Sequence, residues 1–243
     1  MMKSTTIVIN GKPFTYVDEL TDMSYEGLEG ISPSDGKMLL YKTKELFDKC
    51  GIEFCLAFGT LLGAIREHAI IPGDEDVDVM TSQEDKLRLN LPFLARNGYE
   101  VCRIIEGELY SFRINQNSYI DVYIIRPLNR SLWAVHCCSL SGLVTPKKYF
   151  KKFIEVEFLG TTFKSPSNPE KLVEFWYGKD WRTPKSGKKY YYEVKSHWYW
   201  KMRILPIIKE LLLWPYWRFL VSSKYANMTD SITDWKKYKK GLL

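Results

Sequence analysis

The sequence predicts a mixed α/β protein with a smaller helical part at its C-terminal end. Short apolar runs rich in β-branched and aromatic residues alternate with amphipathic helical patterns over most of the chain. With 243 residues, 45% of them hydrophobic, the chain can bury one large core or two closely packed subdomains. We therefore expect an α/β domain over residues 1–182 and a basic, aromatic-rich helical extension over residues 183–243.

The N-terminal part is expected to form a hairpin, a helix and a buried strand. Asn10-Gly11 separates two apolar runs, which is typical of a tight primed turn and predicts a hairpin over residues 5–17. A helical pattern begins at Ser34 and ends at Gly51, a residue suited to the left-handed C-cap. The apolar run 52–58 then predicts a buried strand.

The middle of the chain predicts one more helix and four more strands. The strands alternate or are continuously apolar, and Asn115-Gln116-Asn117 would join the last two in a hairpin. The expected ranges are a strand at 77–80, a helix at 83–97, and strands at 99–105, 108–114 and 119–125.

Three aspartates alternate around the strand expected at residues 77–80. On an extended chain Asp74, Asp76 and Asp78 would stand on one face, opposite Val77 and Val79. Clustered carboxylates raise one another's pKa unless a cation neutralises them. All-oxygen ligation suits a hard ion such as Mg²⁺ or Mn²⁺. The alternative is a solvated acidic loop, but the residues upstream favour a metal site.

The segment just before the aspartates predicts phosphate binding. Gly59 would let the backbone approach a ligand closely, and Thr60 would cap a short helix while offering its hydroxyl. A helix N-terminus with unpaired N–H donors is a ready phosphate site. Arg66, near the end of that helix, would add a planar guanidinium for a second phosphate. Together with the carboxylates, this layout is expected of metal-assisted phosphoryl or nucleotidyl transfer.

Two charged residues on the later hairpin complete the candidate site. Asp121 lies in the most apolar of the expected strands, where an unpaired carboxylate would be costly. A third metal ligand explains it best, and a hydrogen-bonded structural aspartate is the alternative. Arg113, on the partner strand of the hairpin, would reach a phosphate or be an exposed strand arginine.

Residues 59–79, GTLLGAIREHAIIPGDEDVDV, resemble the signature of the LicD family. That family includes bacterial phosphocholine transferases and is similar to the fukutin-type ribitol-phosphate transferases. The resemblance extends over residues 52–80, recurs at residues 119–123 and returns at residues 168–181, which look like the family's later Tyr-Gly-x-Asp-Trp segment. Three positions depart from the family pattern: Ala69 replaces a glycine, Gly73 a tryptophan and Glu75 the middle aspartate. The loss of the tryptophan concerns the substrate pocket and leaves the metal ligands intact.

The resemblance implies a nucleotidyltransferase fold of the DNA polymerase beta type. It further implies transfer of a phosphorylated alcohol, such as phosphocholine, from a CDP-linked donor to a sugar hydroxyl, with release of CMP. The acceptor would be a precursor of a surface glycan such as a capsule or lipopolysaccharide, free or lipid-linked. Asp76, Asp78 and Asp121 would hold Mg²⁺ or Mn²⁺, and either Asp121 or Asp74 would accept the proton of the attacking hydroxyl.

Two other functions stay open from the sequence. A nucleotidyltransferase that attaches NMP to a small molecule or a nucleic acid would use the same carboxylates. A non-catalytic glycan-binding or membrane-binding member is the other alternative, although retention of Asp76, Asp78 and Asp121 argues against it.

Charge divides the chain into an acidic part and a basic part. Residues 1–146 contain 14 Lys/Arg against 20 Asp/Glu, and residues 147–243 contain 21 against 9. The second part also contains seven of the eight tryptophans. This composition predicts an anionic partner, either a membrane surface or nucleic acid, although solvated lysine faces would account for the charge equally well. In a LicD-type transferase nucleic acid is not the expected partner.

The apolar segment 204–221 does not read as a transmembrane helix, because Pro206 and Pro215 break it and Lys209 and Glu210 interrupt it. It fits either a segment lying in a membrane interface or helices that pack on the core. The odd number of cysteines without framework spacing indicates a reducing compartment. With no signal-peptide pattern at the start of the sequence, we expect a cytoplasmic protein that can meet the inner face of the membrane.

Overall fold

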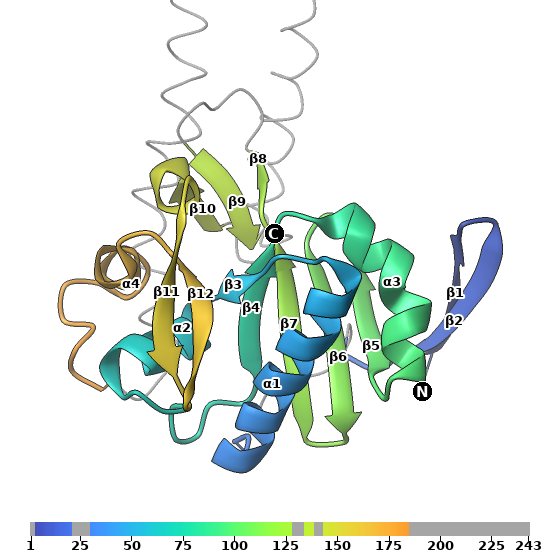
Figure 1. Ribbon diagram of the computed structural model, residues 1–243, viewed down its shortest axis with the longest axis horizontal. Helices are drawn as coiled ribbons and strands as arrows, with labels where there is room; N and C mark the ends of the chain where they lie inside the picture. Colours follow the sequence, from blue (N-terminus) through green and yellow to red (C-terminus); the bar gives the residue numbers. More distant parts are fainter. Residues whose placement is uncertain (1–2, 21–29, 128–133, 139–142, 185–243) are drawn as a thin grey trace, which may run out of the picture. The chain divides into compact units, whose positions relative to one another are not determined.

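The computed structural model of the protein describes residues 3–20, 30–127, 134–138 and 143–184 (Figure 1). Their fold is mixed α/β, as the sequence predicts. The chain divides into two compact units, one formed by residues 1–124 with 153–169 and the other by residues 125–152 with 170–243. The functional boundary expected between residues 182 and 183 stays a prediction.

A five-stranded mixed sheet forms the centre of the first unit (Figure 1). Its strands β4 (Val77–Thr81) and β7 (Ser118–Ile124) are parallel neighbours, and every other neighbouring pair is antiparallel. In spatial order the strands are β3 (Cys55–Leu56), β4, β7, β6 (Leu109–Asn115) and β5 (Glu100–Ile105). Cys55 and Cys102 are fully buried in this sheet, where they pack as small core residues.

Helix α1 (Pro33–Cys50) lies across this sheet and contacts β4, β7 and α3 (Glu84–Arg96) (Figure 1). The predicted start at Ser34 is late, because the Ser32 hydroxyl accepts a hydrogen bond from the Asp35 N–H at 3.1 Å and makes Ser32 the N-cap. The predicted end is confirmed: Gly51 has φ 63° at the C-cap.

Helix α2 (Phe58–Arg66) begins earlier than the sequence suggests. The strand predicted for residues 52–58 is wrong beyond the two residues of β3, because the chain turns into α2 at Phe58, where φ is 33°. Thr60 is also not the cap: Ala57 is the N-cap, and Thr60 lies inside the first turn of the helix. Gly63 allows the chain to return closely, since a Cβ there would lie 2.5 Å from the Ala69 carbonyl oxygen.

Two hairpins complete the first unit. The predicted N-terminal hairpin is confirmed as β1 (Lys3–Ile9) and β2 (Lys12–Asp18), whose turn residues Asn10 and Gly11 both have positive φ. The sequence reading missed the second hairpin, β11 (Phe153–Phe158) and β12 (Thr161–Pro166). The sequence did contain a signal for this hairpin, because Gly160 lies between two runs of alternating residues. In the structure Leu159 and Gly160 both have positive φ and form the turn.

The second unit contains a three-stranded antiparallel sheet, a 3-10 turn and a helix. Trp176 is 1% exposed, and its Nε1–H donates to the Thr145 Oγ1 at 3.0 Å, which joins the helix to the sheet of this unit. The apolar segment 204–221 lies outside the described residues. No helix among the described residues has the length and hydropathy needed to cross a bilayer. The elements are β8 (Arg126–Pro127), β9 (Ala134–Cys138), β10 (Leu143–Pro146), η1 (Lys147–Phe150) and α4 (Pro169–Tyr177).

Candidate active site

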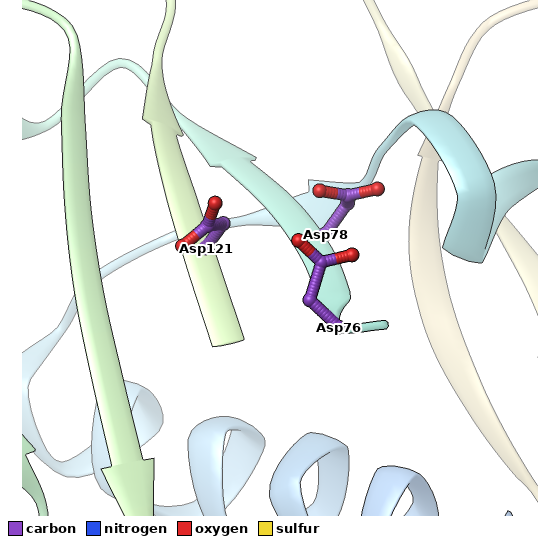
Figure 2. A group of neighbouring side chains, drawn as sticks. All are labelled: Asp76, Asp78 and Asp121. Carbon is purple, nitrogen blue, oxygen red and sulfur yellow. The ribbon is translucent and has the colours of Figure 1, made fainter. Parts of the chain in front are cut away.

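Three carboxylates, two of them on neighbouring strands, converge in the first unit (Figure 2). Each of Asp76, Asp78 and Asp121 offers an oxygen, and these oxygens lie within 4.8 Å of one another. Asp78 is on β4 and Asp121 on β7, whereas Asp76 immediately precedes β4. Asp78 is 7% exposed and Asp121 is 2% exposed, so two of the three carboxylates are almost completely removed from water.

The register between β4 and β7 explains this convergence. Asp78 and Asp121 are direct partners in the parallel ladder, so their side chains emerge on the same face of the sheet. Val77 and Val79 are fully buried on the opposite face. A shift of β4 by one residue against β7 would exchange the two faces of the strand, so that the valines would lie where the aspartates are. Burial of the valines therefore stabilises the register that brings Asp78 and Asp121 together.

Asp74 does not belong to the cluster, and the prediction of three aspartates alternating along one strand is wrong in this respect. The strand begins only at Val77, so Asp74 lies in the preceding connection. Its carboxylate packs against the first turn of α2, where a Cβ on Gly59 would lie 2.4 Å from the Asp74 Oδ2. Burial, and to a smaller extent the charge of Glu75, raise the pKa of Asp74 to about 6, although a hydrogen bond from the Glu75 backbone opposes the rise.

The N-terminus of α2 meets the carboxylate of Asp78. The Gly59 N–H donates to the Asp78 Oδ2 at 3.1 Å, and the Thr60 hydroxyl accepts from the Asp78 backbone N–H at 2.8 Å. Gly59 and Thr60 are therefore in contact with the cluster, through Asp78. The positive end of the helix dipole is directed at a carboxylate, an arrangement that stabilises the ionised form.

The electrostatics of the cluster disfavour three bare carboxylates. Burial raises the pKa of Asp76 well above its ordinary value, and the charges of Asp121 and Asp74 add to this effect. Burial likewise raises the pKa of Asp78, with Asp76 the next cause. Without a cation the cluster therefore tends to keep protons, and a divalent ion would displace them.

Arg103 and Ser111 complete the surroundings of Asp121, and the sequence reading missed both. The Arg103 Nη2 donates to both carboxylate oxygens of Asp121, at 2.7 and 3.0 Å, and its Nε donates to the Ser111 Oγ at 2.9 Å. The Ser111 hydroxyl is 2.5 Å from the Asp121 Oδ1. Arginine in the apolar run VCRII was a usable signal, because a charged side chain buried in a strand requires a partner.

The two other predicted phosphate ligands are found beside carboxylates. Arg66 lies in the last turn of α2, and its Nε donates to the Glu67 Oε1 at 2.6 Å. Arg113 pairs with Glu100, at 2.8 and 2.9 Å, and also with Glu19. Neither arginine belongs to the group of three aspartates, so their roles toward a substrate stay predictions.

The donor set fits a hard divalent cation. All three ligand atoms are carboxylate oxygens, which suit Mg²⁺ or Mn²⁺ rather than a soft metal. When ionised, the three carboxylates and the Arg103 guanidinium together carry a formal charge of −2, which a divalent ion balances. Because unpaired buried charges are costly, a divalent ion would compensate these carboxylates in place of protons.

The part of the chain that contains this site resembles known proteins. Residues 51–168 match the family described as LicD/FKTN/FKRP, nucleotidyltransferase domain. The ribitol-5-phosphate transferase FKTN of Homo sapiens is 27% identical over 188 residues, which cover 74% of this chain and 38% of the relative. The ribitol 5-phosphate transferase FKRP of Mus musculus is 23% identical over 146 residues, 55% of this chain and 29% of the relative. An uncharacterised protein of Rickettsia prowazekii (strain Madrid E) is 34% identical over 89 residues, 36% of this chain and 32% of the relative.

The chain thus spans roughly a third of the length of these curated relatives. Among solved structures, the antibiotic-resistance factor ANT(2'')-Ia superposes with a TM-score of 0.45 at 15% identity, covering 82% of this chain and 97% of the other. The lincosamide antibiotic adenylyltransferase LnuA gives a TM-score of 0.42 at 14% identity, covering 59% and 85%. The sequence match contains all three clustered aspartates, so they lie in the part of the chain, residues 51–168, that matches the LicD/FKTN/FKRP nucleotidyltransferase domain.

Proposed function

We propose that this protein is a metal-dependent transferase that moves a phosphorylated alcohol from a CDP-linked donor to a sugar hydroxyl and releases CMP. The observation that carries the proposal is the buried cluster of Asp76, Asp78 and Asp121 within a LicD-family domain. The names of the FKTN and FKRP relatives, ribitol phosphate transferases, support transfer of a phosphate-containing group. The catalytic domain would be residues 1–182.

Asp76, Asp78 and Asp121 would hold Mg²⁺ or Mn²⁺. When bound, such an ion neutralises charge on the donor diphosphate and orients it for displacement. Residues of the chain would orient these ligands. In the first turn of α2, Gly59 and Thr60 hold Asp78 through two hydrogen bonds. Arg66 at the other end of the same helix would bind a donor phosphate through its planar guanidinium.

Asp74 is the better candidate for the proton acceptor. Both oxygens of Asp121 already accept hydrogen bonds from Arg103, and Ser111 lies against one of them, which suits a ligand held in one orientation. The carboxylate of Asp74 packs at the N-terminus of α2, beside this cluster. In the reaction, the attacking hydroxyl would lose its proton to Asp74, its oxygen would bond to the transferred phosphorus, and the bond from that phosphorus to the CMP oxygen would break.

The acceptor in this proposal is a sugar hydroxyl of a surface-glycan precursor, free or lipid-linked. A lipid-linked acceptor would be met at the inner face of the cell membrane. The net positive charge of residues 147–243, with their tryptophans, supports peripheral contact with an anionic surface. Cosedimentation with anionic liposomes tests this contact: salt-sensitive binding is expected, and its absence would argue for a tail with a different role.

A screen of CDP-linked donors, scored by CMP release with Mg²⁺ and with EDTA, tests the reaction. Choline, ethanolamine, a phosphonate and a polyol phosphate are the donor groups to compare. Metal-dependent CMP release that requires a glycan acceptor is expected, and Asp78→Asn should abolish it. If a labelled nucleotide were instead found on the acceptor, the protein would be an NMP transferase. If no donor were consumed although metal bound, a binding function would replace the proposed one.

A further inference from the structure

We infer that Arg103 is a positioning residue for the proposed metal ligand Asp121. It would hold the Asp121 carboxylate in the orientation that binds the ion, through a guanidinium that does not itself touch substrate or metal. This inference rests on the proposed metal-dependent function and adds a residue that the LicD-like motif does not contain.

A single row of side chains across four strands builds this arrangement. Arg103 on β5 pairs with Ser111 on β6, Ser111 pairs with Asp121 on β7, and Asp121 pairs with Asp78 on β4. Direct partners on neighbouring strands present their side chains on the same face of the sheet. The row therefore leads from a buried guanidinium through Asp121 into the acidic cluster.

The contacts within the row leave Asp121 little freedom. One nitrogen of Arg103 donates to both carboxylate oxygens, at 2.7 and 3.0 Å, and Ser111 bridges the Arg103 Nε and the Asp121 Oδ1. Arg103 is 4% exposed and Ser111 is fully buried, so water does not compete for these hydrogen bonds. The Asp121 carboxylate is thus oriented by Arg103 and Ser111, with a longer hydrogen bond from the Tyr123 hydroxyl to its Oδ2 at 3.5 Å, while it lies within 4.8 Å of the oxygens of Asp76 and Asp78.

A contribution to stability alone is a poor explanation for this pair. Burying an arginine and an aspartate costs desolvation energy that their attraction often fails to recover, and an apolar pair of similar volume is frequently as stable. The Asp121 carboxylate of this pair also faces the carboxylates of Asp76 and Asp78, which repel it when all three are ionised. The pair is explained if Arg103 holds the Asp121 carboxylate in the one orientation that binds a cation.

Charge and geometry give opposite expectations for the substitution Arg103→Lys. Lysine keeps the positive charge but has no planar group that can donate simultaneously to Asp121 and Ser111. If Arg103 only balanced charge, Arg103→Lys would bind the ion as tightly as the wild type. If Arg103 positions the ligand, the same variant should bind more weakly by about 10- to 100-fold, the usual effect of losing an outer hydrogen-bond partner.

The experiment is titration of metal-free protein with Mn²⁺ alone, by calorimetry, for wild type, Arg103→Lys and Ser111→Ala. Weaker binding is expected in both variants, with unchanged circular dichroism. Arg88→Lys is the matched control, because Arg88 is an arginine of the same unit that pairs with Glu106 on the surface. It should bind Mn²⁺ like the wild type. If Arg103→Lys fails to fold, Ser111→Ala decides the question, since it removes only the bridging hydroxyl.

A thermodynamic cycle with Asp121→Asn shows whether Arg103 acts through Asp121. In that background Arg103→Lys should weaken Mn²⁺ binding by much less than it does in the wild type. The positioning role would be overturned if Arg103→Lys lowered Mn²⁺ affinity by the same factor with and without Asp121→Asn, or if Arg103→Lys alone bound Mn²⁺ like the wild type. Either result would leave the metal site in place. If the wild type itself bound no Mn²⁺, both this inference and the proposed function would fail.

Discussion

Replacing Asp76 with asparagine should stabilise the metal-free protein and remove its response to metal. Asp76 is partly buried immediately before β4 and lies in the cluster with Asp78 and Asp121. Asparagine keeps the shape of the side chain but removes one of the three charges that repel one another. The variant should consequently gain stability in EDTA and lose turnover, because it offers a poorer ligand to the ion.

The size of the effect follows from the geometry. Two unit charges at the 4.8 Å limit of the cluster repel by about 3.5 kcal/mol at an effective dielectric constant of about 20. Protonation relieves part of this repulsion, as the raised pKa values of Asp76 and Asp78 indicate. A gain of about 1–3 kcal/mol is therefore expected at neutral or alkaline pH, and each kcal/mol should raise the Tm by about 2–4 °C.

The pH dependence gives this prediction a sign. The pKa of Asp76 is higher in the folded protein than in the unfolded chain, so the folded protein binds more protons between these two values. The stability of the metal-free wild type should fall as pH rises from about 4 through that window. Asp76→Asn has no carboxyl group at this position to titrate. The difference in free energy of unfolding between this variant and the wild type should therefore grow as pH rises.

Thermal unfolding in EDTA and in Mg²⁺, at several pH values, measures both effects. Asp48→Asn is the control, because Asp48 is an exposed carboxylate on α1 outside the cluster. It should leave the Tm and the metal response unchanged. An Asp76→Asn variant less stable than the wild type in EDTA at alkaline pH would refute the reasoning about repulsion. A full wild-type response to Mg²⁺ in that variant would refute the assignment of Asp76 as a ligand.

Three further outcomes are expected. Arg66→Lys should lower kcat/KM by about 10-fold, because lysine keeps the charge but loses the planar fork; unchanged kinetics would leave Arg66 as a partner of Glu67 only. Gly63→Ala should destabilise the protein by about 1–3 kcal/mol in denaturant unfolding, because its Cβ would lie 2.5 Å from the Ala69 carbonyl oxygen, and a more stable variant would contradict that packing. Mn²⁺ affinity measured by calorimetry should increase with pH, because the ion must displace protons from carboxylates whose pKa values are raised, and an affinity independent of pH would contradict protonation of the free cluster.

Local signals in the sequence were sufficient for most of the fold. Asn10-Gly11 predicted the first hairpin, Gly51 the end of α1, and the apolar runs predicted β4 to β7 within a few residues. The largest error concerned residues 52–58, where an apolar run was read as a strand although α2 begins at Phe58. An apolar run predicts burial but not strand pairing, and Ile52 and Phe54 are buried without belonging to a strand or helix.

The sequence by itself determined which residue types are available for chemistry. Alternating carboxylates, the Gly-Thr segment before them and an aspartate in an apolar strand were each visible along the chain, and their resemblance to the LicD pattern supplied the family. These signals are local, because side-chain alternation and turn preferences depend only on neighbouring residues.

Only the tertiary structure decided which of these residues meet. The register of four strands aligned Arg103, Ser111, Asp121 and Asp78 in one row, whereas Asp74 was placed against Gly59 outside the cluster. The local alternation of residues decides which face of each strand is buried, but which residues become partners on neighbouring strands depends on packing between segments distant in sequence. The raised pKa values of Asp76 and Asp78 depend on the same packing, because burial and the approach of other carboxylates arise only when the strands assemble.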